Sequence, residues 1–166
     1  MLIITPPPII NTQGFTLVEF ILVILLMSII SIAILPQWTA TTLNVEFEAR
    51  RILNDIRYTQ ALSMATGQRY RWVRTSATTY QIINSAGTAL ILPSGSTQAT
   101  LTSNVSFGAF TNLPNNLIAF DSTGTPYTDT GSPGTPLAAT AIIPAVIGSN
   151  TRSIQVTPST GYGALQ

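Results

Sequence analysis

Residues 14–36 read GFTLVEFILVILLMSIISIAILP, and this stretch decides the fold. Its apolar part runs from Phe15 to Leu35, and a helix of that length, rising about 1.5 Å per residue, crosses a hydrocarbon layer of roughly 30 Å. The only charged residue in the run is Glu19. Because a carboxylate inside a bilayer costs roughly 2.5–3.5 kcal/mol on insertion scales, Glu19 is a candidate functional residue. We therefore predict a transmembrane helix over residues 15–36.

The rest of the chain is polar yet almost uncharged. Charged residues make up 8% of the 166 and the net charge is +1, whereas a typical soluble domain has about 25% charged residues. This balance gives no case for bulk electrostatic binding to nucleic acid or anionic lipid. The absence of Cys excludes a disulfide framework, and the absence of His removes the commonest general base and metal ligand. The composition fits an extracytoplasmic β-rich protein and argues against an enzyme.

Residues 1–14 differ from an ordinary secretory signal. Pro6, Pro7 and Pro8 force an extended piece that cannot join the following helix. A secretory signal carries its small-residue cleavage site after the apolar stretch, whereas Gly14 comes before it. Cleavage after Gly14 would leave the apolar helix on the mature protein.

Residues 14–19, Gly-Phe-Thr-Leu-Val-Glu, resemble the type III signal of type IV prepilins and pseudopilins at all six positions. The resemblance implies that residues 1–14 are a leader and that a membrane-embedded prepilin peptidase cuts between Gly14 and Phe15. It also implies that the same enzyme methylates the new amino group of Phe15. In the assembled filament, the Glu19 carboxylate would pair with the Phe15 amino group of a neighbouring subunit.

Two features near the apolar run leave alternatives open. The leader has no Lys or Arg, so the positive-inside rule gives no support for a cytoplasmic N-terminus. In the plainer alternative, Gly14 is a loop residue and Glu19 caps a signal-anchor helix. Pro36 kinks the helix or ends its lipid-facing part, and the resemblance implies local melting of the helix at Pro36 in a filament.

A second helical pattern occupies residues 37–67, from about Leu43 to Ala65, with Gly67 as a stop signal. Its expected apolar stripe is Val45, Ala49, Ile52, Leu53, Ile56, Leu62 and Met64, and the charged residues Glu46, Glu48, Arg50, Arg51, Asp55 and Arg57 lie off that stripe. The spacing also predicts ion pairs Glu46–Arg50 and Glu48–Arg51, each worth only tenths of a kcal/mol.

From residue 68 to 166 the periodicity changes to two, which indicates a β-rich domain. The predicted strands are residues 69–74, 79–83, 89–92, 105–110, 117–120, 141–147 and 154–156, with a long loop over residues 122–135. Pro144 predicts that its strand is an edge or broken strand. The fold class is therefore α+β: a long N-terminal helix packed on an antiparallel sheet.

The sequence offers little catalytic chemistry. Asp121-Ser-Thr-Gly124 superficially suggests an aspartic protease, but an extra residue intervenes and a second copy is missing, so a turn is expected. Neither a serine-triad motif nor an acidic calcium loop stands out. We predict a protein that is not an enzyme and has no metal or cofactor.

Nucleic-acid binding is the rival function. Arg69, Arg71 and Arg74 lie close together with Tyr70 and Trp72 between them, and such a strand could contact phosphates and stack bases. The favoured interpretation is an exposed polar face with the aromatic residues in the core, because salt-dependent affinity needs several phosphate contacts.

The β-rich part resembles the GspH/FimT-like minor pseudopilins, and a minor pilin of the mannose-sensitive haemagglutinin type would look similar. The resemblance rests on the helix ending Ala-Leu-Ser-Met-Ala, residues 61–65, on Phe120 followed by Asp-Ser-Thr-Gly, and on the terminal Ile154-Gln-Val156 with the glycines after it. It implies a bacterial inner-membrane, single-pass subunit with a periplasmic C-terminal domain. Its partners would be prepilin peptidase, other pilins or pseudopilins, an inner-membrane assembly platform and membrane lipid. The chain would enter a type IV pilus or a type II secretion pseudopilus; a DNA- or ligand-binding tip subunit and a signal-anchored periplasmic enzyme are the alternatives.

Overall fold

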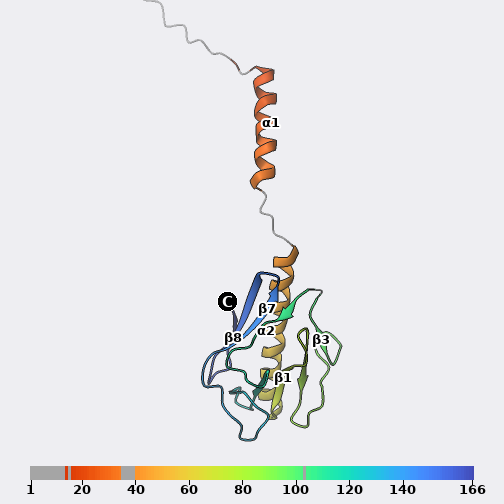
Figure 1. Ribbon diagram of the computed structural model, residues 1–166, viewed down its shortest axis with the longest axis vertical. Coiled ribbons are helices and arrows are strands. Elements are labelled where there is room, and N and C mark those ends of the chain that lie inside the picture. Colours follow the sequence, from red (N-terminus) through yellow and green to blue (C-terminus); the bar gives the residue numbers. More distant parts are fainter. Residues whose placement is uncertain (1–13, 15, 35–39, 103) are drawn as a thin grey trace, which may run out of the picture. The chain divides into compact units, whose positions relative to one another are not determined.

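The computed structural model describes residues 14, 16–34, 40–102 and 104–166. The chain forms two units, residues 1–37 and 38–166. The first contains helix α1, Leu17–Ile34, and the second contains helix α2, Ala40–Thr66, with the strands (Figure 1).

Helix α1 confirms helical structure for the apolar run but gives no support for its predicted membrane crossing. Within the described ranges, no helix combines the length and the apolarity that a bilayer span requires. Most of the predicted leader, together with Phe15 and Pro36, lies outside the described residues.

Helix α2 packs one wide face against the strands. Figure 1 shows it running along β1, Tyr70–Arg74, and the pair β7 and β8, Ala141–Ile147 and Asn150–Val156. The predicted positions Val45, Ala49, Ile52, Leu53 and Ile56 are all buried, which confirms most of the stripe.

The two ends of α2 depart from the prediction in different ways. The helix begins at Ala40, three residues before the expected start. Near its C-terminus Met64 is 54% exposed, and Ser63 is buried instead. Ser63 tolerates burial because its hydroxyl donates a hydrogen bond to the Thr59 carbonyl at 3.1 Å. Gly67 ends the helix as predicted, with φ of 70° and its N–H donating to the Ser63 carbonyl.

The strands form two antiparallel sheets. The five-stranded sheet has the order β3-β2-β1-β5-β6, and the four-stranded sheet has the order β4-β7-β8-β9. The remaining bounds are β2 Thr79–Ile83, β3 Ala99–Thr100, β4 Ser106–Phe107, β5 Leu117–Phe120, β6 Pro126–Tyr127 and β9 Gly163–Leu165. This confirms the α+β class and an antiparallel arrangement.

Aromatic rings fill the core beside α2. The Trp72 ring lies 5.1 Å from that of Tyr80 and 5.7 Å from that of Phe107, centroid to centroid. Trp72 and Tyr80 are completely buried. Aromatic pairs at these separations stabilise a fold beyond the effect of the area that they bury. This cluster therefore stabilises the contact between the five-stranded sheet, with Trp72 and Tyr80, and β4, with Phe107.

Several strand predictions are confirmed and others are wrong. The strands at residues 79–83, 117–120 and 141–147 have the predicted bounds. Residues 89–92 form no strand and contribute one isolated bridge, from Ala89 to Ile83. The short strands β3, β6 and β9 were not predicted, because two or three residues are too few to display a period of two. β6 also interrupts the long loop predicted over residues 122–135.

Pro144 lies inside an unbroken seven-residue strand, so the prediction of an edge or broken strand is wrong. β7 lies between β4 and β8, and the Pro144 carbonyl accepts from the Gly108 N–H at 2.9 Å, just beyond the end of β4. A residue's N and carbonyl oxygen face the same neighbouring strand. The missing N–H of Pro144 therefore faces Gly108, whose carbonyl accepts from Arg74 Nη1 at 3.2 Å.

Candidate functional site

The first turn of α1 is capped by the signal-like motif itself. The Glu19 N–H donates to the Thr16 Oγ1 at 3.3 Å, and the Phe20 N–H donates to the Thr16 carbonyl at 3.1 Å. Thr16 is thus the N-cap and Glu19 the third helical residue, and the Thr16 hydroxyl supplies one of the two bonds of a capping box. A carboxylate in this turn also gains roughly 0.3–1 kcal/mol from the helix dipole. The Thr16 side chain therefore makes this cap, and the prediction that Glu19 itself caps the helix stays a prediction.

The side chain of Glu19 is nevertheless available to another molecule. It is exposed, and none of the described residues forms an ion pair or hydrogen bond with its carboxylate. Capping and pairing with a second chain are compatible, because the cap uses the Glu19 backbone N–H and leaves the carboxylate oxygens open.

The apolar side chains of α1 are uncovered in the single chain. From Leu17 at 76% to Val23 at 41%, the large apolar side chains described between residues 17 and 29 are exposed. A contiguous exposed apolar patch of this kind marks a site of contact with another protein or with a membrane.

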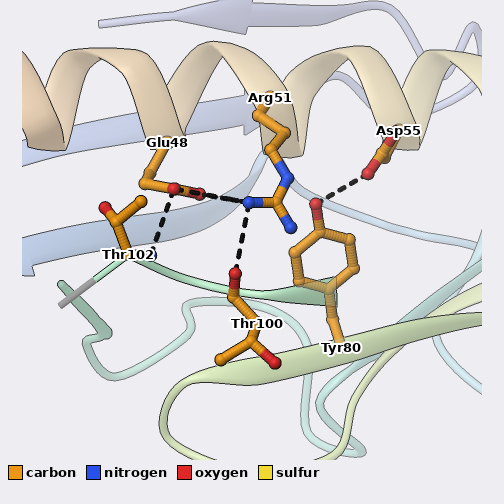
Figure 2. Close-up of polar contacts among 6 residues, drawn as sticks. All are labelled: Glu48, Arg51, Asp55, Tyr80, Thr100 and Thr102. Carbon is orange, nitrogen blue, oxygen red and sulfur yellow. Dashed lines mark hydrogen bonds and ion pairs between the residues drawn. The ribbon is translucent and has the colours of Figure 1, made fainter. Parts of the chain in front are cut away.

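Two acidic residues of α2 are buried, contrary to the prediction that they lie off the apolar stripe. Glu48 is completely buried and Asp55 is 7% exposed. We call Glu48, Arg51, Asp55 and Tyr80 the buried acid cluster (Figure 2). The apolar periodicity does not predict the burial of Glu48 and Asp55, because the buried face of α2 is wider than its apolar stripe. Both carboxylates accept hydrogen bonds from residues distant in the sequence, Thr102 and Tyr80.

Glu48 is held from two directions. Arg51 Nη1 lies 3.2 Å from Glu48 Oε2, which confirms the predicted pair, and the Thr102 N–H donates to Glu48 Oε1 at 3.1 Å. The same Nη1 donates to the Thr100 carbonyl at 3.2 Å. These contacts join α2 to β3 and the residues that follow it, as Figure 2 shows.

Asp55 is held by one strong contact. The Tyr80 hydroxyl donates to Asp55 Oδ2 at 2.6 Å. Burial raises the pKa of Asp55, and the Tyr80 hydrogen bond and the Arg51 charge offset only part of that rise. Burial, together with the adjacent Asp55 carboxylate, likewise raises the pKa of Tyr80, so its hydroxyl stays protonated and donates.

Glu46 is the second charged junction on α2. Its carboxylate forms ion pairs of 2.7 Å with Arg50, as predicted, and of 2.7 Å with Arg152 on β8. The partners are 66% and 47% exposed, so each pair contributes about 0–1 kcal/mol.

The proposed nucleic-acid residues do not form a free surface. Trp72 is completely buried, so it is not available for base stacking, as the favoured interpretation expected. Arg69 stacks on the Tyr127 ring at 3.9 Å from its centroid and donates to the carbonyls of Gly131 and Pro133. Nucleic-acid contact stays a prediction, with less geometric support than the sequence pattern suggested.

The other two arginines also bind backbone carbonyls. Arg74 donates to the carbonyls of Ser76 at 3.0 Å and Gly108 at 3.2 Å. Arg71 Nη2 donates to those of Asn84 at 2.8 Å and Ser85 at 3.0 Å. Each side chain therefore fastens a loop.

The segment Asp121–Gly124 is a turn between β5 and β6, as expected. Asp121 Oδ1 accepts from the N–H groups of Thr123 and Thr125, each at 2.9 Å. Partial burial by itself would raise the pKa of Asp121, but these bonds and those from the Thr123 and Tyr127 hydroxyls hold the pKa below its ordinary value. Within the described residues, no group of three or more acidic side chains could hold a metal ion.

Comparison with known proteins gives a fold but no family. No family model and no curated protein matches the chain. Two solved structures do, both of the type IV minor pilin FimU of Pseudomonas aeruginosa strain PAO1. The crystal form in space group P21 has a TM-score of 0.53 and 11% identity, and covers 74% of this chain and 87% of that chain. The form in space group P65 has a TM-score of 0.51 and 11% identity, and covers 73% and 91%.

This chain has a type IV pilin-like fold. The similarity spans most of the FimU chain in both crystal forms. The narrower resemblances to GspH/FimT-like and haemagglutinin-type pilins stay predictions.

Proposed function

We propose that this chain is a minor pilin, a non-catalytic subunit of a type IV pilus-like filament. The observation that carries the proposal is the exposed apolar helix α1, with its capped first turn at Thr16 and Glu19, in a chain whose other unit contributes to a pilin-like fold. An apolar helix that its own chain leaves uncovered needs a bilayer or neighbouring helices to cover it. A subunit that is stored in a membrane and then packed helix to helix meets both needs in turn.

In this proposal, prepilin peptidase cuts between Gly14 and Phe15 and methylates the Phe15 amino group. The assembly helix covers residues 15–36, and the inner membrane holds it until an assembly platform delivers the subunit to the filament. Residues 68–166 form a periplasmic domain, and Pro36 allows local melting of the helix during packing. Whether the filament is a pilus or a type II secretion pseudopilus depends on the other subunits.

Glu19 would set the register of assembly. Its carboxylate is unpaired among the described residues, and it would meet the positively charged amino group of Phe15 on a neighbouring subunit. Each charge alone is expensive in an apolar surrounding, and the pair offsets that cost. Only one axial position of the incoming subunit brings the two charges together, so the pair selects that position.

The mature N-terminus tests processing. Mass spectrometry of the protein recovered from membranes is expected to find N-methyl-phenylalanine, from Phe15, as the first residue. An intact Met1, or cleavage elsewhere, would overturn the processing step and with it the proposed assembly.

Substitution of Glu19 tests the pairing. Glu19→Ala is expected to leave the membrane-bound amount unchanged and to lower the amount in sheared filaments by about tenfold or more, the factor for a loss of roughly 1.4 kcal/mol. Glu19→Gln is the matched control, because Gln also serves in a capping box but carries no charge. If Glu19→Gln assembles normally, the charge of Glu19 is not needed for assembly and the proposed pairing is wrong.

A further inference from the structure

The second unit contains a buried arginine, Arg71, that forms no ion pair with any described residue. Arg71 is only 7% exposed, and none of the described carboxylates lies within ion-pair distance of its guanidinium. A guanidinium has five N–H donors. The Arg71 bonds to the Asn84 and Ser85 carbonyls come from Nη2 alone, and the buried Nε has no partner.

The charge of Arg71 is buried without a neighbouring carboxylate among the described residues. A buried charge is ordinarily paired, because burial without a partner of opposite sign is costly. Burial lowers the pKa of Arg71, and the nearby charge of Arg69 lowers it further. Arg69 itself has Asp129 beside it, since the Arg69 charge contributes to holding the pKa of Asp129 low. Arg57 and Arg74 also lack a carboxylate within ion-pair distance among the described residues, but Arg71 is the buried arginine of this group.

A hollow of about 520 Å³ opens beside Arg71. Both Arg71 and Arg69 line it, and polar residues complete its wall: Gln68, Ser85, Ser122 and Ser132. The one acidic residue in the lining is Asp121, whose carboxylate already accepts from Thr123, Thr125 and Tyr127. The lining therefore has one more positive than negative side chain, together with hydroxyl and amide groups.

We propose that this hollow is a binding site for a small ligand carrying one oxyanion, a carboxylate or a phosphate group, which pairs with Arg71. Arg suits both groups because its guanidinium stays charged, and the Nη1 donors of Arg71 remain open for an oxyanion oxygen while Nη2 binds the Asn84 and Ser85 carbonyls. The serine hydroxyls and the Gln68 amide would bind other polar parts of the ligand. The site lies in the second unit.

Selective observation of the arginine side chains tests the site. The full chain, in non-ionic detergent and with ¹⁵N-labelled arginine, is titrated with inorganic phosphate and separately with acetate, at constant ionic strength with chloride. The Arg71 Nε–H resonance is expected to shift and saturate, while that of Arg74 stays in place. Arg74 is the matched control, because it is on the same strand, binds carbonyls and does not line the hollow.

The variant Arg71→Lys keeps the charge but loses the guanidinium and its Nη1 donors. Binding, followed at the backbone amides of Ser85 and Ser122, is expected to weaken roughly tenfold, whereas Arg74→Lys binds as the wild type does. If Arg71→Lys does not fold, the wild-type resonance is assigned by elimination, from single Lys variants of the other arginines.

Each outcome of the titration decides the proposal. Saturation with phosphate or with acetate supports the oxyanion site and identifies which group it prefers. An unmoved Arg71 resonance in both titrations, or parallel shifts of all arginines, would overturn it. Neither result bears on N-terminal processing or on Glu19, so the two proposals fail separately.

Discussion

Replacing Tyr80 by Phe removes one oxygen atom from the centre of the buried acid cluster. Asp55 Oδ2 then loses the hydroxyl that lies 2.6 Å away. Asp55 is 7% exposed, so water has little access to replace the lost donor. Hydrogen bonds to charged groups contribute about 1.5–3 kcal/mol, and an unsatisfied buried acceptor loses the full benefit. We expect Tyr80→Phe to lower the free energy of unfolding by about 1.5–3 kcal/mol at neutral pH.

The assay is urea denaturation of the purified chain, followed by circular dichroism. Tyr127→Phe is the matched control, because the Tyr127 hydroxyl donates to Asp121 Oδ2 at 3.2 Å at a partly exposed site. Asp121 keeps the Thr123 and Thr125 donors on its other oxygen, so the control should lose less than about 1 kcal/mol. Equal losses in the two variants, or a loss of only a few tenths of a kcal/mol in Tyr80→Phe, would refute this account of the cluster.

Two further predictions concern Asp55 and the loop before β9. The raised pKa of Asp55 means that the folded state binds the Asp55 proton more tightly than the unfolded state does. The free energy of unfolding therefore decreases as the pH rises from the ordinary pKa of 3.8 through the raised pKa. Urea titrations across that range should find Asp55→Asn gaining stability relative to wild type with rising pH, and a pH-independent difference would contradict the shift. Gly161→Ala should lower the melting temperature strongly, because φ is +64° and the new Cβ would lie 2.6 Å from Gln60 Nε2 and 2.7 Å from the Gly124 carbonyl oxygen. Gly148→Ala, at φ +58° with open space around it, should lose only the roughly 1–2 kcal/mol of the left-handed conformation, and equal losses would show that packing at Gly161 is irrelevant.

The sequence predicted the elements that are long and strongly patterned. The α2 stripe and the strands 79–83, 117–120 and 141–147 follow from periods of 3.6 and 2, which local sequence carries. The same reasoning placed Trp72 in the core, where it is completely buried.

What the sequence did not reveal depends on partners that are distant along the chain. Glu48 and Asp55 can be buried because Thr102 and Tyr80 donate hydrogen bonds to their carboxylates. The sequence pattern of α2 alone cannot predict either hydrogen bond. The sequence placed Arg71 on an exposed basic strand, yet its guanidinium donates to the carbonyls of Asn84 and Ser85. Buried polar groups require the whole fold before they can be recognised.

The buried acid cluster also has a mechanical consequence. Glu48 and Asp55 are about two helical turns apart on α2. Glu48 is bonded to Thr102, just after β3, and Asp55 to Tyr80 on β2. A force directed along α2 would slide the helix past the sheet and load both ties together, in shear. Neither carboxylate could move without losing its partner while still shielded from water. Tension along α2 would therefore load all contacts between the helix and the strands at the same time. We expect the domain to unfold in one abrupt step under force, and not by detachment of one residue after another.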